Sequence, residues 1–136
     1  MATIPEMHFA GPRRMAATRI ATYAEFWRFY LREHAQPRTR GWHYLGTSLA
    51  LLCLAAAIAF RMPWLFTGAV VAGYAPAWIG HGLVEKNRPA TLRYPLWSLF
   101  SDFRLYGAWL SGRVPGELAK AGIEPKGKAA RSERGR

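Results

Sequence analysis

The stretch that decides the fold is GWHYLGTSLALLCLAAAIAF at residues 41–60, followed by Arg61 and by MPWLFTGAVVAGYAPAWIGHGLV at residues 62–84. Apart from Arg61, the stretch contains no Asp, Glu, Lys or Arg. As α-helices the two runs would be about 30 and 35 Å long, which matches the hydrocarbon thickness of a bilayer. Because a membrane offers the backbone no other hydrogen-bonding partner, such runs are best satisfied as helices. The sequence therefore predicts an all-α membrane protein built on a helical hairpin of two spans, with its turn at residues 61–63.

The basic residues predict the orientation of this hairpin. The chain of 136 residues has 19 Lys and Arg against eight Asp and Glu. Seven of the 19 precede Trp42, eleven follow Val84, and only Arg61 lies in the turn. By the positive-inside rule, both termini face the cytoplasm. The 15 Arg to four Lys, with abundant Ala, are typical of GC-rich bacterial genomes, so we expect the bacterial inner membrane.

Composition also excludes several classes of protein. The only cysteine, Cys53, has no partner for a disulfide or for a cysteine zinc site. The net charge of +11 alone would suggest nucleic acid, but the aromatic residues lie mostly in apolar runs, and we predict no nucleic-acid partner. A water-soluble pair of helices is the alternative to a membrane hairpin. Such helices would have a polar face with a period of 3.6 residues, and neither run has one.

Amphipathic helices are predicted on both sides of the hairpin. TYAE at residues 22–25 matches a capping box, and Pro37 is expected to end the helix that follows. After the hairpin, Pro95 suits the first position of a helix that continues to Leu110. We interpret this helix as interfacial, with a third, short span as the alternative. The expected apolar stripes are Tyr23, Phe26, Trp27, Tyr30, Leu31 and His34, and then Leu96, Leu99, Phe100, Phe103, Gly107 and Leu110.

Three of the four histidines are predicted to meet at one depth. His43 lies 18 residues before Arg61, and His81 lies 19 residues after Met62. An antiparallel hairpin therefore brings both imidazoles to the same level at its cytoplasmic end. His34 is on the apolar stripe of the preceding helix and can fold back to that level. Since ionisable residues within spans are functional candidates, we expect an interfacial metal site there, with backbone-bonded structural histidines as the alternative.

Charged residues next to these histidines complete the candidate site. Glu85 follows His81 by four residues, which places both on one helix face. Imidazole and carboxylate together suit iron, zinc or manganese, so Glu85 is a candidate ligand or a hydrogen-bond partner of one, unless it pairs with a nearby cation. Arg40 and Arg88 are candidates to bind a fatty-acid carboxylate. Their alternative partners are anionic lipid headgroups.

Two motifs resemble a known family, the 2-hydroxy fatty acid dioxygenases. HAQP at residues 34–37, RGWH at residues 40–43 and the following Gly46 are similar to the family segment HxxPxNRxxHxxG. GHGLVEKNRPA at residues 80–90 is similar to its second signature, GHxxxEKxxPA. Thr39 stands where the family usually has Asn, which weakens any role for that amide.

The resemblance implies a membrane-embedded, Fe(II)-dependent enzyme that uses O2 to shorten a 2-hydroxy fatty acid by one carbon. His34, His43 and His81 would be the iron ligands and Glu85 a catalytic fourth ligand or a partner of one, while two histidines with Glu85 stay open as another set. Three protein ligands leave room for a 2-hydroxy carboxylate and O2. The alternative is a non-catalytic membrane hairpin whose His and Arg side chains bind lipid headgroups. A homo-oligomer is left open.

Three segments follow from this interpretation. Residues 1–21 form an N-terminal segment in which His8 is expected to be solvated. Residues 22–113 form the membrane-embedded catalytic domain. Residues 114–136 form a basic tail, predicted to be disordered because it lacks aromatic residues and is rich in Lys, Arg, Gly and Ala.

Overall fold

The computed structural model describes residues 19–124, and within them it contains helices and no strand. The predicted all-α class is therefore confirmed. His8 and the rest of residues 1–18 lie outside the described part. In order, the elements are α1 (Tyr23–Glu33), α2 (Pro37–Ala59), α3 (Trp64–Gly80), the π-helical turn η1 (His81–Glu85), the 3-10 turn η2 (Ala90–Leu92), α4 (Pro95–Leu110) and α5 (Val114–Lys120).

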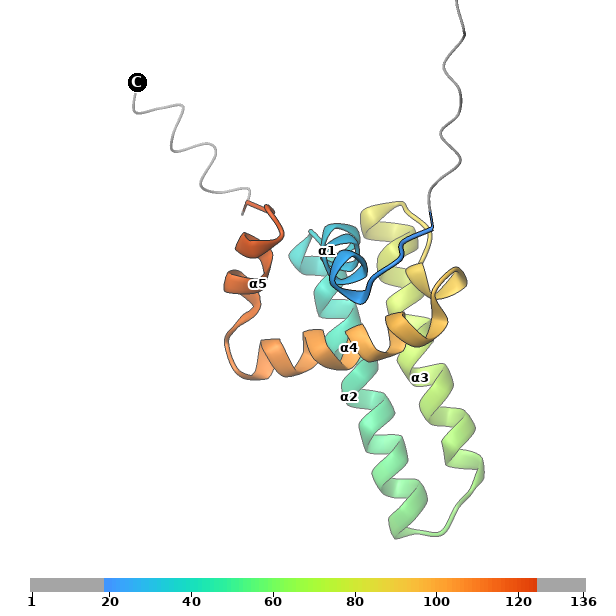
Figure 1. Ribbon diagram of the computed structural model, residues 1–136. Helices are drawn as coiled ribbons and strands as arrows, with labels where there is room; N and C mark the ends of the chain where they lie inside the picture. The colour runs from blue at the N-terminus through green and yellow to red at the C-terminus, as the bar shows by residue number, and fades with distance from the viewer. Residues whose placement is uncertain (1–18, 125–136) are drawn as a thin grey trace, which may run out of the picture.

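Helices α2 and α3 form the predicted antiparallel hairpin (Figure 1). The chain reverses at residues 60–63, as expected, with Arg61 in the left-handed region at φ 53°. Gly46 lets the two helices approach closely, because a Cβ atom there would lie 2.7 Å from the carbonyl oxygen of Gly73. Close packing of this pair fixes the levels at which its side chains lie.

The start of α2 differs from the prediction. Pro37 was expected to end the preceding helix, but α1 already ends at Glu33 and Pro37 opens α2. Proline suits this first helical position because its missing N–H would have no partner there anyway. Arg40 consequently lies on the first turn of α2.

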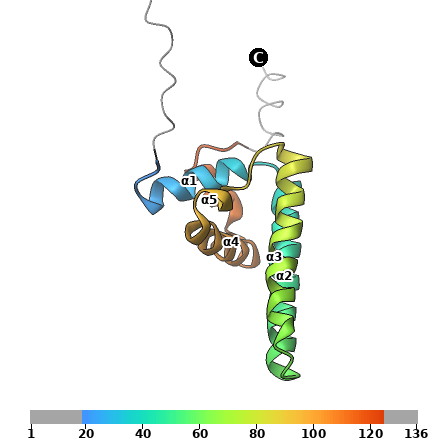
Figure 2. The same ribbon diagram turned by 90° about the vertical axis from the view of Figure 1, so that its right-hand side faces the viewer.

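The membrane prediction is supported in part. Among the described residues, α2 is the one helix that is long and apolar enough to cross a membrane; α3 has 17 residues, so two spans are not confirmed. Toward the turn, the hairpin lies away from the other helices (Figures 1 and 2). Large apolar side chains are exposed there on both helices, among them Leu52, Ile58, Phe60, Trp64, Val70 and Val71.

Beside the other half of the hairpin, α4 packs against α2, and α1 and α5 pack against α4. Thr22 Oγ1 accepts a hydrogen bond from the backbone N–H of Glu25 (3.3 Å), which confirms where α1 was predicted to begin. The predicted apolar stripe of α1 is the centre of the core. The core side chains are Phe26, Trp27, Tyr30, Leu31, Ala90, Tyr94, Leu105, Ala108, Val114 and Leu118.

Helix α4 begins at Pro95, as predicted, and crosses the hairpin (Figures 1 and 2). Its buried face includes Ser98 and Ser101. By contrast, Leu96 and Phe100 of the predicted apolar stripe are 79% and 60% exposed. The stripe therefore faces outward, and the face that packs against the protein combines the two serines with Leu105 and Ala108.

Helix α5 corrects the prediction of a disordered tail from residue 114. Val114 and Leu118, one turn apart, are buried in the core and hold this helix against α1 and α4. Glu117 accepts a hydrogen bond from the indole Nε1–H of Trp27 (2.8 Å). The prediction of disorder rested on the lack of aromatic residues after residue 113, and it overlooked this short apolar face. Residues 125–136 lie outside the described part of the chain.

Candidate metal centre

The three predicted histidines lie together where α1 ends, α2 begins and α3 passes into η1. His34 is the C-cap of α1, His43 lies on the second turn of α2, and His81 is the first residue of η1. All three are buried. Their Nε2 atoms are 2.9 Å (His34 to His43), 3.0 Å (His34 to His81) and 3.2 Å (His43 to His81) apart. The three ligand atoms therefore share one small volume, as a metal site requires.

Each imidazole is oriented by an oxygen bound to its other nitrogen. His34 Nδ1 lies 2.6 Å from the carbonyl oxygen of Tyr30, and His43 Nδ1 lies 3.0 Å from Asp102 Oδ1. His81 Nδ1 lies 2.7 Å from Asn87 Oδ1. Because these oxygens accept, each Nδ1 must carry the proton. The three Nε2 atoms are then left with bare lone pairs that point toward one another.

Three lone pairs at such distances repel one another unless a positive charge lies among them. Burial, followed by the proximity of His43 and His81, holds the pKa of His34 well below its ordinary value. The cluster therefore disfavours protonation as the source of that charge, whereas a metal cation would use all three lone pairs. Neutral imidazoles with oxygen acceptors on the far nitrogen are the arrangement typical of histidine metal ligands.

Asp102 of α4 connects the cluster to the core. Besides His43 Nδ1, its Oδ1 accepts a hydrogen bond from the Tyr30 hydroxyl. Burial and then the Asp102 charge raise the pKa of the Tyr30 phenol well above its usual range, so the phenol keeps its proton and acts as the donor. The ring of Tyr30 also stacks on the imidazole of His34, with centroids 4.0 Å apart.

The segment after η1 folds back to hold His81. Lys86 adopts a left-handed conformation at φ 55°, and the N–H of Asn87 then donates to the His81 carbonyl (3.1 Å). The Asn87 side chain accepts from His81 and donates through Nδ2 to Glu33 Oε2 (2.6 Å). These contacts tie the start of η1 to the end of α1.

Glu85 does not lie where the sequence analysis expected it. Its Oε1 accepts from the backbone N–H of Gln36 (2.8 Å) and from the Thr39 hydroxyl (3.0 Å), and it is outside the group of converging ligand atoms. The π-helical turn between His81 and Glu85 replaces the α-helix assumed for their four-residue spacing. Glu85 thus caps the start of α2, and Thr39, the departure from the family pattern, holds it there.

The two predicted substrate-binding arginines differ in what surrounds them. The Arg40 guanidinium is buried, and its Nη1 donates to the carbonyls of His34 (2.8 Å) and Ala35 (2.7 Å). Arg40 therefore holds the turn between α1 and α2. Arg88 is exposed and follows Asn87 directly in the chain.

Sequence reasoning missed the oxygens that orient the imidazoles. Asp102 is the only aspartate in the chain and lies within a helix that is otherwise mostly apolar, which was a usable signal. Asn87 lay inside the second motif but was given no role. The carbonyl of Tyr30 carried no signal, because any residue offers a carbonyl.

Comparison with known proteins agrees with the geometry. A family model described as "Mpo1-like: 2-hydroxy-palmitic acid dioxygenase Mpo1-like" matches residues 20–114, which is most of the described part of the chain. The match includes all three histidines and Asp102. No significant match was found among curated proteins or among solved structures.

Proposed function

This chain belongs to the Mpo1-like family, and from that premise we propose that it is an Fe(II)-dependent dioxygenase that shortens 2-hydroxy fatty acids by one carbon at a membrane surface. The family description supports the dioxygenase class and a long-chain 2-hydroxy acid as the substrate class. The single observation that carries the proposal is the convergence of the Nε2 atoms of His34, His43 and His81, which we assign as the metal ligands.

The spacing of these nitrogens supports an octahedral ion. Two nitrogens about 2.1 Å from an ion lie about 3.0 Å apart at a right angle and about 3.4 Å apart at a tetrahedral angle. The separations of 2.9 and 3.0 Å match the first value, and the separation of 3.2 Å lies midway between the two values. Fe(II) held there would supply a Lewis acid for the substrate oxygens and electrons for O2, with open positions for both.

The protein's own groups would keep this site ready for the cation. Tyr30, Asn87 and Asp102 hold the three protons on the Nδ1 atoms, so that no Nε2 has to lose a proton before a metal binds. Asp102 is the charged member of these acceptors. Its hydrogen bond makes His43 the most electron-rich of the three proposed ligands.

The substrate is proposed to enter from the bilayer. A 2-hydroxy fatty acid would leave its tail in lipid while its carboxylate and hydroxyl reach the histidine cluster. Arg88, exposed beside Asn87, is the cation that we propose for the carboxylate during entry. Arg40 has Nη1 committed to two carbonyls, so any contact that it makes with substrate would use its other nitrogens.

A bilayer around the hairpin would account for its exposed apolar side chains. We propose that α2 and α3 both insert, with the turn at residues 60–63 on the far side and both termini in the cytoplasm of a bacterium. The positions of the first and last helices support this topology, since α1 and α5 both lie at the end of the hairpin away from the turn (Figure 1). The outward-facing apolar stripe of α4 would then lie along the membrane surface.

The decisive experiment is product analysis with purified protein. Protein in detergent is loaded anaerobically with Fe(II), mixed with 2-hydroxypalmitate and O2, and the products are identified by mass. We expect an acid one carbon shorter, no reaction with palmitate, which lacks the hydroxyl, and no reaction in His81→Ala. Iron-loaded protein that forms no shortened acid from 2-hydroxy acids of several lengths would contradict the proposal and favour a hairpin that only binds lipid.

A further inference from the structure

A series of stacked rings leads from the histidine cluster to the protein surface. Tyr30 stacks on His34 with centroids 4.0 Å apart and planes 23° apart. Trp27, one turn earlier on α1, stacks on Tyr30 with centroids 5.6 Å apart and planes 11° apart. Trp27 and Tyr30 are both buried, so two successive ring stacks lead through the protein interior from a proposed ligand to Trp27. Such contacts allow rapid electron transfer over short steps.

Each of the two oxidisable rings has its acidic proton bound to a carboxylate. The Tyr30 hydroxyl donates to Asp102, and the Trp27 indole Nε1–H donates to Glu117 Oε2 (2.8 Å). Loss of an electron makes a phenol a strong acid and makes an indole N–H far more acidic than it is in the neutral ring. A carboxylate already in hydrogen-bond contact can take that proton in the same event, which makes the oxidation easier.

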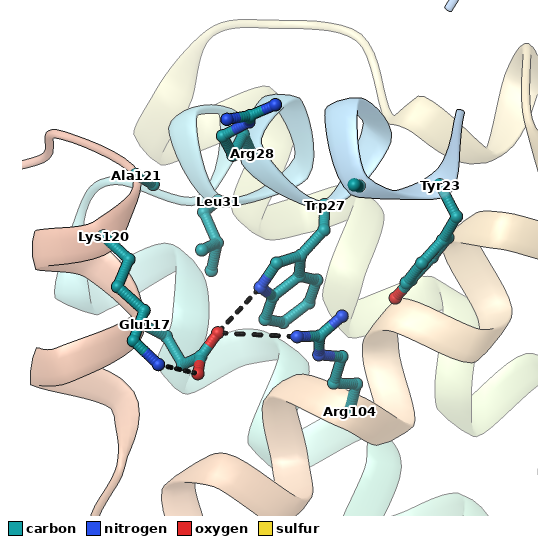
Figure 3. A pocket seen from close by; sticks show the side chains of 9 residues that line it. Tyr23, Trp27, Arg28, Leu31, Arg104, Glu117, Lys120 and Ala121 are labelled. Atoms are coloured by element: carbon teal, nitrogen blue, oxygen red, sulfur yellow. Dashed lines mark hydrogen bonds and ion pairs between the residues drawn. The ribbon is translucent and has the colours of Figure 1, made fainter. Parts of the chain in front are cut away.

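The outer end of the series lies at the wall of a pocket, where 6% of Trp27 is exposed. Trp27 lines a pocket of about 370 Å³ between α1, α4 and α5 (Figure 3). Three cations, Arg28, Arg104 and Lys120, line the same pocket, and the Arg104 guanidinium lies 4.2 Å from the Trp27 ring centroid. Glu117 lies there too and pairs with Arg104 (3.6 Å) and Lys120 (3.5 Å), so the lining keeps an excess of positive charge. A small anionic reductant, such as a thiolate or an enediolate, would be attracted to this end.

We propose that Tyr30 and Trp27 form a protective electron-transfer route, which returns electrons from a reductant in this pocket to the histidine cluster when O2 reacts there without a substrate to oxidise. This inference rests on the proposed function, because it needs an oxidant derived from O2 at the cluster. Without the route, the nearest oxidisable groups would be the histidines themselves.

The electron and proton balance closes over three steps. Tyr30 gives one electron to the oxidant and its phenolic proton to Asp102. Trp27 then gives one electron to Tyr30 and its indole proton to Glu117, while Asp102 returns the first proton to Tyr30. The reductant finally gives one electron to Trp27, which recovers its proton from Glu117. In sum, one electron passes from the reductant to the oxidant, and both carboxylates regain their starting state.

Radical detection tests the route without depending on product formation. Ferric protein in detergent, without fatty acid, is mixed with hydrogen peroxide and frozen within milliseconds to seconds. Radicals in the frozen samples are detected by electron paramagnetic resonance, and protein labelled with ring-deuterated tyrosine shows which signals belong to tyrosine. We expect short-lived tyrosyl and tryptophanyl radicals in the wild type. In Trp27→Phe, the tyrosyl signal should last several-fold longer than in the wild type. In Tyr30→Phe, both signals should be absent, and peptide mass analysis should show faster oxidation of the histidines.

Trp97→Phe is the matched control. Trp97 stacks on Tyr94 with centroids 5.8 Å apart, and among the described residues this pair reaches Tyr30 only through the ring of Phe26, which is much harder to oxidise than tyrosine or tryptophan. The radical signals of Trp97→Phe should therefore equal those of the wild type. Helicity and iron content are measured for every variant. If Tyr30→Phe does not bind iron, the result for Trp27→Phe alone tests the route.

The outcomes separate the two proposals. Unchanged radicals and unchanged histidine oxidation in iron-bound Trp27→Phe and Tyr30→Phe would overturn the route while shortened product still supports the function. Radicals that follow the predicted pattern without any shortened product would overturn the function instead. A wild type that binds no iron would overturn both.

Discussion

At the residue scale, the chemistry of the site depends on which nitrogen of each imidazole carries the proton. The sequence predicted that His34, His43 and His81 would meet, because hairpin spacing and helix phase are both readable from a sequence. The tautomers were not readable. They depend on acceptors far apart in the chain, of which Asp102 is 59 residues from His43. Such pairs are set by how α4 crosses the hairpin, and no local pattern encodes that crossing.

Asp102→Asn isolates the charge behind His43. The amide oxygen can still accept from His43 Nδ1, so the imidazole should keep its orientation while losing the negative charge that makes it electron-rich. We expect metal affinity to fall about 10- to 100-fold, measured by chelator competition with Fe(II) or Co(II). Glu25→Gln, on the exposed first turn of α1, is the control and should have no effect. Equal metal affinities in Asp102→Asn and the wild type would show that the Asp102 charge does not strengthen metal binding through His43.

Glu85→Gln distinguishes a helix cap from a metal ligand. A glutamine oxygen can still accept from the Gln36 N–H and the Thr39 hydroxyl, and only the charge at the start of α2 is lost. We expect unchanged iron stoichiometry and a loss of about 0.3–1 kcal/mol in the free energy of unfolding. Loss of bound iron from a folded Glu85→Gln protein would restore Glu85 as a ligand.

At the scale of elements, the uncharged runs predicted the hairpin and its turn because length and polarity alone decide them. Two boundaries were missed for physical reasons. Pro37 fits both after a helix and at the first position of one, and the sequence does not say which it does. Helix α5 has a single buried pair, Val114 and Leu118, which is too short a pattern to stand out in a basic segment.

Gly46→Ala tests the close approach of α2 and α3. The added Cβ would lie 2.7 Å from the Gly73 carbonyl oxygen and 3.2 Å from that of Ala72, so the helices must move apart. We expect destabilisation of about 1–3 kcal/mol in thermal unfolding in detergent. Gly41→Ala, in the same helix, meets nothing within 4 Å and should stabilise the protein by up to about 1 kcal/mol. Equal effects of the two substitutions would contradict the observed packing of the hairpin.

At the scale of the whole molecule, two opposite surfaces meet in one small chain. The turn half of the hairpin and the outer stripe of α4 are apolar, while α1 and α5 carry basic residues at the other end. The histidine cluster lies where these regions adjoin, and a substrate with a polar head and an apolar tail would reach it from that boundary. The sequence predicted this polarity from charge placement, although it assigned no structure to α5.

The most direct test of the metal centre is anaerobic Fe(II) binding to detergent-purified protein, measured by equilibrium titration with metal analysis. We predict one tightly bound Fe(II) per chain in the wild type and loss of that site in His34→Ala, His43→Ala and His81→Ala, each verified as folded by its helicity. Wild-type protein that binds no iron, or folded histidine variants that bind it as tightly as the wild type, would contradict the claim that these three imidazoles form a metal centre.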